Sequence, residues 1–275
     1  MFELFKTILC LSAVGSGVVI ILMLAKPWAV KRLSARLHYS IWLIAVLFML
    51  IPFWKAVPQR AVEPVADQSV TRQAEQNGGT AEDNTQTVII DQPPIEYREI
   101  RLTADRSIRI YDLIAYIWAA GAGVFMFAAI GSYTVFLIKK KRGSVELVSY
   151  EMLEDVKREL NIKRRIRIRV SDEAESPMLT GVFFPIIYIP RESISETRQR
   201  MILKHELTHY KSRDLLSKWL TLFVNALHWF NPFAYFLSAN INQACEVACD
   251  MSVVQNMSDE DKWLYMETIL DLAER

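Results

Sequence analysis

Three long apolar runs most constrain how this chain can fold. They cover residues 4–25, 37–54 and 111–138, and very few charged side chains interrupt them. About 20 apolar residues are enough for a helix to cross the hydrocarbon core of a bilayer. The runs therefore predict three transmembrane helices, the first two within residues 1–54 and the third at residues 112–138.

A cleaved signal peptide is the alternative interpretation of the first run. Its start is only weakly basic, no A-x-A cleavage site follows it, and the next segment is apolar as well. These features are not typical of a secretory signal. We therefore interpret the first run as a retained membrane helix.

Two basic clusters predict the orientation in the membrane. Residues 26–38, between the first two runs, carry four bases and no acid, and residues 139–142 read Lys-Lys-Lys-Arg. Loops rich in lysine and arginine stay on the cytoplasmic side. Three crossings then place the N-terminus outside and residues 139–275 in the cytoplasm of a multi-pass cell-membrane protein.

Residues 55–111 differ in character from the apolar runs. They are rich in Gln, Glu, Asp, Pro and Thr, and acids exceed bases. This composition is typical of partly disordered chain. The segment is predicted to be an extracellular loop, which is either a passive tether or a contact surface for a sensor.

The clearest chemical signal is the pentapeptide His205-Glu206-Leu207-Thr208-His209. Histidines four residues apart on a helix share one face, so both imidazoles reach a single ion. Zinc suits such ligands, and a water in its open fourth position has a pKa of about 7. Glu206 is then placed as the catalytic base. A chance match within a long helix is the alternative, and the apolar residues 201–203 before the motif favour the site.

A third ligand is expected from Glu246. A complete fourth crossing by the apolar residues 215–237 would carry Glu246 to the other side of the membrane from the histidines. Asn231-Pro232 offers a break instead. The two arms on either side of it span about 25 Å and about 20 Å at 1.5 Å per residue, so they nearly match. This predicts a membrane-associated helical hairpin at residues 214–256 that returns Glu246 to the site.

Other polar residues near the motif have two interpretations each. Asp250 shares a helix face with Glu246 and would orient a ligand histidine through its second ring nitrogen. A solvated Glu246 and a salt-bridged Asp250 are the alternatives. Asp214 is interpreted as the cap of the next helix rather than a partner of a ligand histidine. His228 is interpreted as a hydrogen-bonded structural residue.

The cysteines Cys10, Cys245 and Cys249 are interpreted as reduced packing residues. Cys245 and Cys249 lie four residues apart, outside the two-residue spacing of a zinc knuckle. Metal ligation or a redox pair is the alternative for these two.

The segment at residues 176–190, SPMLTGVFFPIIYIP, reads as extended chain. Its internal proline restricts it to the edge of a sheet. A peptide can add to such an edge as another strand, which predicts substrate binding at Leu179, Thr180, Gly181 and Val182. Ordinary hydrophobic packing is the alternative.

The net charge of +1 argues against direct binding of nucleic acid, which needs a strongly basic surface.

Several motifs together resemble the BlaR/MecR-type membrane metallopeptidases, the antirepressor receptors of beta-lactam resistance. They are HELTHYKSRDLL, WFNPF, EVACD and SPMLTGVFFPIIYIP, and together they are much more specific than the HExxH pentapeptide alone. The resemblance covers most of the chain and is weakest at residues 55–112. It implies an α-helical membrane protein with a cytoplasmic α+β gluzincin-like domain, one zinc ion held by His205, His209 and Glu246, and Glu206 as the base. It also implies cleavage of a cytoplasmic repressor-like protein, and self-cleavage.

One departure bears on the signal. These receptors usually carry a C-terminal penicillin-binding sensor with an S-x-x-K motif, and this sequence contains no S-x-x-K. The chain is expected to be a fragment or to sense through another extracellular module or partner, and a homodimer is compatible with this scheme. Two other functions stay open: a non-proteolytic transmembrane receptor with a structural zinc site closed by Cys249, and a housekeeping membrane protease.

Overall fold

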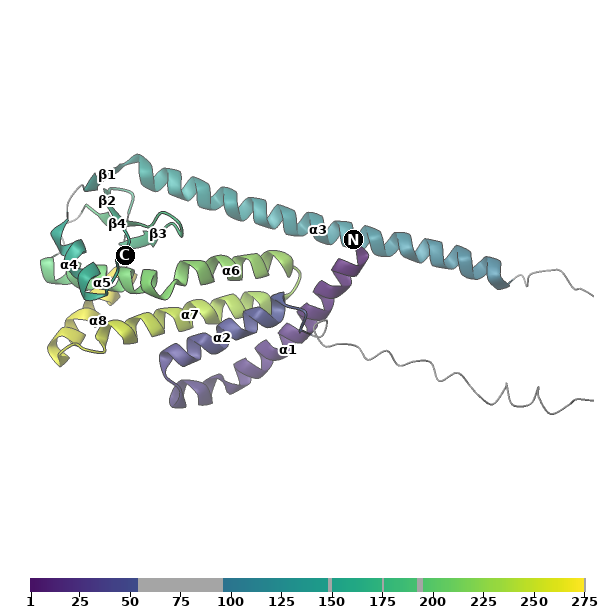
Figure 1. The fold of residues 1–275 in the computed structure, drawn as a ribbon, viewed down its shortest axis with the longest axis horizontal. Helices are drawn as coiled ribbons and strands as arrows, with labels where there is room; N and C mark the ends of the chain where they lie inside the picture. Colours follow the sequence, from purple (N-terminus) through teal and green to yellow (C-terminus); the bar gives the residue numbers. More distant parts are fainter. Residues whose placement is uncertain (54–95, 148–149, 175, 192–194, 275) are drawn as a thin grey trace, which may run out of the picture. The chain divides into compact units, whose positions relative to one another are not determined.

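The computed structural model describes residues 1–53, 96–147, 150–174, 176–191 and 195–274, and is mostly helical (Figure 1). The described residues of the ranges 1–51 and 115–275 form one compact unit. Residues 55–95 of the expected extracellular loop lie outside the described residues. The remainder of that segment, residues 96–111, is helical and forms the first part of helix α3 (Glu96–Arg142). The sequence has no glycine or proline between residues 96 and 120 that would end the helix.

Two helices are long and apolar enough to cross a membrane. They are α1 (Phe2–Arg32) and the part of α3 at Ile110–Arg142. The second apolar run forms α2 (Ala35–Leu50), which has 16 residues and so spans about 24 Å. This length is below the roughly 30 Å of a hydrocarbon core. The described residues thus contain two candidate spans and one shorter apolar helix where three crossings were expected.

The apolar helices form a bundle with the α6–α7 hairpin. Helix α6 (Asp214–Leu227) and helix α7 (Pro232–Val254) meet at Asn231, whose side chain accepts a hydrogen bond from the Phe233 amide and caps α7. Trp42 and Val46 of α2 are buried in one core with Leu237 and Ile241 of α7. Helix α7 therefore packs along α2, side by side with α6 (Figure 1).

A four-stranded sheet lies at the end of the bundle where α3 finishes. It contains β1 (Ser144–Leu147), β2 (Arg167–Ser171), β3 (Met178–Thr180) and β4 (Ile186–Pro190) in the order β1-β2-β4-β3. Only β2 and β4 are parallel, and β3 pairs antiparallel with β4. Strand β3 is thus an edge strand. The expectation that the whole segment 176–190 lies at a sheet edge is wrong for its second part, because β4, which directly follows Pro185, pairs with a strand on each side.

Helices α4 (Glu151–Glu159) and α5 (Glu196–Ser212) cover the sheet. Val156 of α4, Ile168 of β2 and Leu207 of α5 share a core. Helix α8 (Asp259–Ala273) packs against α5 through Tyr265, which contacts Met201 in a second core. Helix α5 is therefore held between the sheet and α7–α8, and its polar face turns toward α7.

Candidate metal centre

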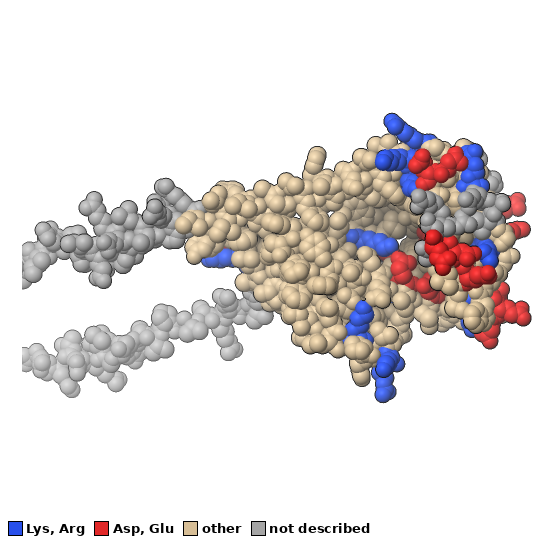
Figure 2. Space-filling model, turned by 180° about the vertical axis from the view of Figure 1, so that it is seen from behind, with Lys and Arg blue, Asp and Glu red and all other residues tan. Residues whose placement is uncertain are grey.

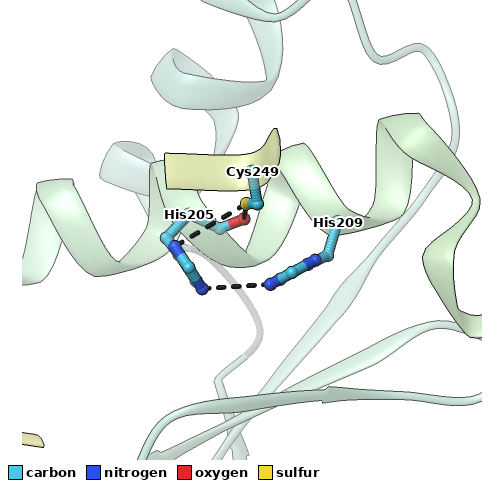
Figure 3. Close-up of side chains that lie close together, drawn as sticks. All are labelled: His205, His209 and Cys249. Carbon is cyan, nitrogen blue, oxygen red and sulfur yellow. Dashed lines mark hydrogen bonds between the residues drawn. The ribbon is translucent and has the colours of Figure 1, made fainter. Parts of the chain in front are cut away.

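Helix α5 brings the two histidines of the motif together. The Nε2 atoms of His205 and His209 lie 3.0 Å apart, and the ring planes are nearly perpendicular (Figure 3). The four-residue spacing places both rings on one helix face. The two nitrogens therefore point at the same small volume.

Glu246 arrives at this volume from α7. Its Oε2 atom lies 3.2 Å from Nε2 of His209 and 3.8 Å from Nε2 of His205. Helix α7 is held against α5 because Cys249 packs beside Met201 and donates to the His205 carbonyl. The structure thus brings together the three side chains that the sequence predicts as ligands.

The three atoms have the spacing of a zinc ligand set. Two ligand atoms about 2.0–2.1 Å from zinc at a tetrahedral angle lie about 3.3 Å apart. The separations of 3.0, 3.2 and 3.8 Å bracket this value. A nitrogen, nitrogen and oxygen donor set of this size fits zinc.

A buried carboxylate orients His209. Asp214 is 2% exposed, and its Oδ2 atom lies 2.7 Å from Nδ1 of His209. The interpretation of Asp214 as a helix cap is wrong, because Arg213 occupies the N-cap position with φ 60° and the Asp214 side chain turns back to α5. Tyr39 of α2 donates to the other oxygen at 3.1 Å. No pattern in the sequence points to this role of Tyr39, because 175 residues separate it from Asp214.

His205 is oriented in a similar way. Its Nδ1 atom lies 2.8 Å from the Tyr265 hydroxyl and 3.3 Å from Oδ1 of Asp250. Tyr265 in turn donates to Asp250 at 2.7 Å. Asp250 lies where the sequence predicted, whereas Tyr265 was missed because α8 carries no motif. Carboxylates behind the ring nitrogens keep Nε2 free for a metal.

Glu206 lies beside the histidines and against the edge strand. Its Oε2 atom accepts a hydrogen bond of 2.7 Å from the Leu179 amide. Burial raises the pKa of Glu206, and the adjacent imidazoles oppose this rise. A carboxylate with a raised pKa is suited to accept a proton near neutral pH.

The carboxylates also act on the imidazoles. Burial lowers the pKa of His205, but the contacts with Asp250 and Cys249 outweigh burial and raise the pKa to about 10. The pKa of His209 is raised in the same way against burial, mainly by Asp214. The groups around the two rings thus stabilise positive charge at this position, and a bound cation would carry such a charge.

Similarity to known proteins decides the family. The family model described as BlaR1 peptidase M56 matches residues 6–275. This chain belongs to the BlaR1 peptidase M56 family.

Two curated relatives are similar to this M56 chain. Regulatory protein BlaR1 of Bacillus licheniformis is 22% identical over 258 residues, which are 91% of this chain and 43% of that protein. Methicillin resistance mecR1 protein of Staphylococcus aureus strain Mu50 is 24% identical over 281 residues, covering 96% of this chain and 46% of that protein. The chain therefore spans less than half the length of these relatives. The family resemblance predicted from the motifs is confirmed.

The cysteines of the M56 chain lie behind the ligand set. The ligating atoms of His205, His209 and Cys249 lie within 4.8 Å of one another, as do those of His209, Cys245 and Glu246. The Cys249 sulfur is 3.7 Å from Nδ1 of His205, however, and the Cys245 sulfur is 3.9 Å from Nδ1 of His209. Each sulfur thus faces the ring nitrogen opposite the one that points at Glu246. Both cysteines are buried, and Cys10 is exposed.

The predicted substrate residues are distributed over adjoining cavities. Leu179 lines a cavity of about 200 Å³ together with both histidines, Glu206 and Glu246. Thr180 lines a neighbouring apolar cavity of about 390 Å³. Gly181 and Val182 line a third, of about 600 Å³, together with His209. Leu179 of β3 thus lies at the metal centre, whereas Gly181 and Val182 follow β3 and border a cavity that, among the predicted ligands, reaches only His209.

His228 lies at the tip of the hairpin, at the end of α6. It is fully buried, and its Nε2 atom lies 2.9 Å from the Met49 carbonyl oxygen. This contact agrees with the interpretation of His228 as a hydrogen-bonded structural residue.

Proposed function

We propose that this M56 chain is a membrane-bound zinc endopeptidase that acts in signal transduction. It would cleave a cytoplasmic protein such as a transcriptional repressor, itself, or both, in response to an extracellular signal. The observation that carries this proposal is the convergence of His205, His209 and Glu246 on one volume, with Glu206 between that volume and an edge strand.

His205, His209 and Glu246 would hold the zinc ion. Bound zinc supplies Lewis acidity both to a peptide carbonyl and to an attacking water. Asp214 and the Tyr265–Asp250 pair keep the two imidazoles oriented and hold their protons on Nδ1.

Glu206 would transfer a proton from the attacking water to the leaving amine. The Leu179 amide occupies its Oε2 atom, which leaves Oε1 to take a proton from water as the water oxygen attacks the peptide carbon. The same carboxyl then gives this proton to the amine that leaves when the C–N bond breaks. Its raised pKa suits both transfers.

The substrate would bind as an extra strand on β3. The outer side of β3 has no neighbouring strand among the described residues. Main-chain hydrogen bonds to such an edge bind extended peptides with little dependence on sequence. A peptide in this position would lie across the cavity that contains Glu206 and the histidines.

The contacts of both basic clusters support a cytoplasmic site. Lys26, in the C-terminal part of α1, donates to Asn240 and Gln243 of α7 at 2.7 Å each. Lys140, at the end of α3, contacts the Glu173 carbonyl beside the sheet. Both clusters therefore lie at the end of the bundle that carries Glu246 and the sheet, and the positive-inside rule assigns that end to the cytoplasm. On the face that Figure 2 shows, most of the coloured charged side chains lie toward this end as well.

The test uses the full chain in lipid nanodiscs and in cells. Metal analysis should give one zinc ion per chain for the natural form and for Glu206→Gln, and less for Glu246→Gln. Comparison of new protein N-termini in cells should show cleavage products that disappear with Glu206→Gln. Products that persist with Glu206→Gln would reject the proposed base.

A non-proteolytic receptor is the second candidate. It requires a closed site, and Cys249 was the expected fourth ligand. The Cys249 sulfur faces Nδ1 of His205, on the side away from Glu246. This arrangement favours a position that stays open for water and substrate, as in catalytic zinc sites. Zinc binding without any product in the natural form would favour the receptor.

A further inference from the structure

The turn between β3 and β4 presents two aromatic side chains to the surroundings. In residues 181–185, called here the aromatic turn, Phe183 is 75% exposed and Phe184 is 76% exposed. Gly181 has φ +81°, and a Cβ atom there would lie 2.4 Å from the Phe184 carbonyl oxygen. Arg164 donates to the Phe183 carbonyl. The conformation of Gly181 and the Arg164 contact thus fix the turn so that two adjacent aromatic rings face outward. Exposed apolar side chains held in this way are typical of a binding surface.

Cationic side chains surround the aromatic turn. Cavities of about 600 Å³ and about 430 Å³ flank it. Glu146 is the one acidic residue in their lining, and it pairs with Arg169 at 2.9 Å. Among the described residues, none of the six cations in the lining forms an ion pair. These cations are Lys163, Arg164, Arg165, Arg167, Lys211 and Arg213. The partner of this surface should therefore be anionic.

The depth of the turn follows from the helices beside it. The rings of Tyr133 on α3 and Trp219 on α6 are 5.1 Å apart, and the two helices run in opposite directions (Figure 1). Tyr133 lies about 9 Å along its helix from the first base of the cluster, Lys139, at 1.5 Å per residue. Because α6 runs opposite to α3, Leu216 lies about 4.5 Å closer than Trp219 to the level of Lys139. Leu216 also lines the same cavity as Phe183. With Lys139 at the inner headgroup level, as in the membrane placement proposed above, the aromatic turn lies where aromatic and basic residues meet headgroups.

The exposed face of α6 continues the apolar surface of the turn. Leu216, Leu220 and Phe223 are 52%, 36% and 44% exposed. Their spacing of four and three residues places them in one stripe. In the membrane placement proposed above this stripe faces acyl chains, and it begins beside the aromatic turn.

We infer that the aromatic turn binds the inner leaflet of the membrane. Phe183 and Phe184 insert at the boundary between headgroups and acyl chains, and the six cations bind anionic headgroups. The inference rests on the membrane placement and not on the peptidase activity. An acidic protein would pair with the six cations but would leave the apolar α6 stripe beside the aromatic turn uncovered. A lipid leaflet covers the cations, the turn and the stripe together, so the continuity of the turn with the stripe favours lipid. Since the turn ends β3, whose Leu179 amide binds Glu206, lipid contact would fix the edge strand at the metal centre.

Spin labels on the full chain in nanodiscs test this inference. The exposed Cys10 is replaced by serine, and a nitroxide is attached at Phe184→Cys, which retains Phe183. Phe127→Cys, on the 82% exposed Phe127 of α3, reports the bilayer interior, and Glu260→Cys, on exposed Glu260 of α8, reports water. The chain without an added cysteine gives the background from Cys245 and Cys249. Collision with oxygen is compared with collision with a water-soluble nickel chelate.

In phosphatidylglycerol nanodiscs, the label at 184 should give an oxygen-to-nickel ratio between those at 127 and 260. Adding Lys163→Glu and Lys211→Glu, which leaves the Arg164 contact intact, should shift the ratio at 184 toward that at 260. In phosphatidylcholine nanodiscs, these two substitutions should have little effect.

Two results would overturn the inference. A label at 184 as accessible to nickel as the label at 260, with the label at 127 protected, removes the lipid contact and leaves an acidic protein as the partner. A label at 127 that is itself open to nickel removes the membrane placement, and with it the proposed topology. Neither result bears on whether Glu206→Gln abolishes cleavage, so failure of the peptidase proposal is separately visible.

Discussion

Oδ2 of Asp214 lies 2.7 Å from Nδ1 of His209. The other oxygen of this buried carboxylate accepts a hydrogen bond from Tyr39. An apolar helix, α2, thus contacts a proposed zinc ligand through one intervening side chain. The metal centre is therefore built partly by the membrane bundle and partly by the sheet domain.

Replacing Asp214 by alanine should lower zinc affinity about 10–100-fold, as removal of a carboxylate behind a ligand histidine commonly does. The His209 ring loses the partner that fixes its tautomer and its orientation. Competition with a chromophoric chelator, using the full chain in nanodiscs, measures the change. Asp259→Ala is the control, because that side chain is 94% exposed on α8. Equal affinity for the two variants would contradict the role assigned to Asp214.

Replacing Tyr265 by phenylalanine should have a smaller effect. The hydroxyl that bridges His205 and Asp250 is lost, but Oδ1 of Asp250 still lies 3.3 Å from the ring nitrogen. The expected loss is one hydrogen bond, about 1 kcal/mol or about fivefold in zinc affinity. Asp250→Ala should cost more in the same competition assay. A larger loss for Tyr265→Phe than for Asp250→Ala would show that the tyrosine, not the carboxylate, holds the ring.

Replacing Cys249 by serine separates an open site from a closed one. The sulfur lies 3.7 Å from Nδ1 of His205, so it should not bind an ion held by the Nε2 atoms. Zinc content should stay at one ion per chain, and affinity should change less than for Asp214→Ala. Cobalt substitution gives a second readout, since a thiolate ligand adds an intense near-ultraviolet band. Such a band in the natural chain, lost in Cys249→Ser, would instead establish the receptor with a structural site.

Two glycines of α3 test how closely this helix packs on the hairpin tip. A Cβ atom on Gly121 would lie 2.6 Å from the Trp229 indole, whereas Gly123 has nothing within 4 Å. Gly121→Ala should destabilise the chain by about 1–3 kcal/mol, the usual effect of overpacking. Gly123→Ala is the matched control and should not. Thermal unfolding in detergent measures both, and similar midpoints would contradict this packing of α3 on Trp229.

Local patterns in the sequence predicted the parts of the centre that depend on helix geometry. The spacing of His205 and His209 fixes their common face, and the break at Asn231-Pro232 lies where α7 begins. The extended pattern of residues 176–190 predicted a strand there; the structure divides it into β3 and β4, with Pro185 in the turn between them and only β3 at an edge. These features follow from backbone rules that act over a few residues.

Apart from the return of Glu246 through the helical hairpin, contacts between distant segments were not predictable in this way. Tyr39 and Tyr265 reach the centre only because α2 and α8 pack against α7 and α5. Asp214 was assigned to a cap because its sequence position fits one. The left-handed conformation of Arg213 instead turns the Asp214 side chain toward His209. The length of α2 was overestimated, because hydrophobicity continues to Trp54 while the helix ends at Leu50.

The packing of α7 has a practical consequence for biochemistry. One side of this helix delivers Glu246, and its other side rests on α2. A soluble fragment beginning at the sheet would lack α2 and Tyr39, leaving apolar residues of α7 uncovered and Asp214 without its donor. Inactivity of such a fragment would say nothing about the intact chain, so purification strategies should keep the amino-terminal helices.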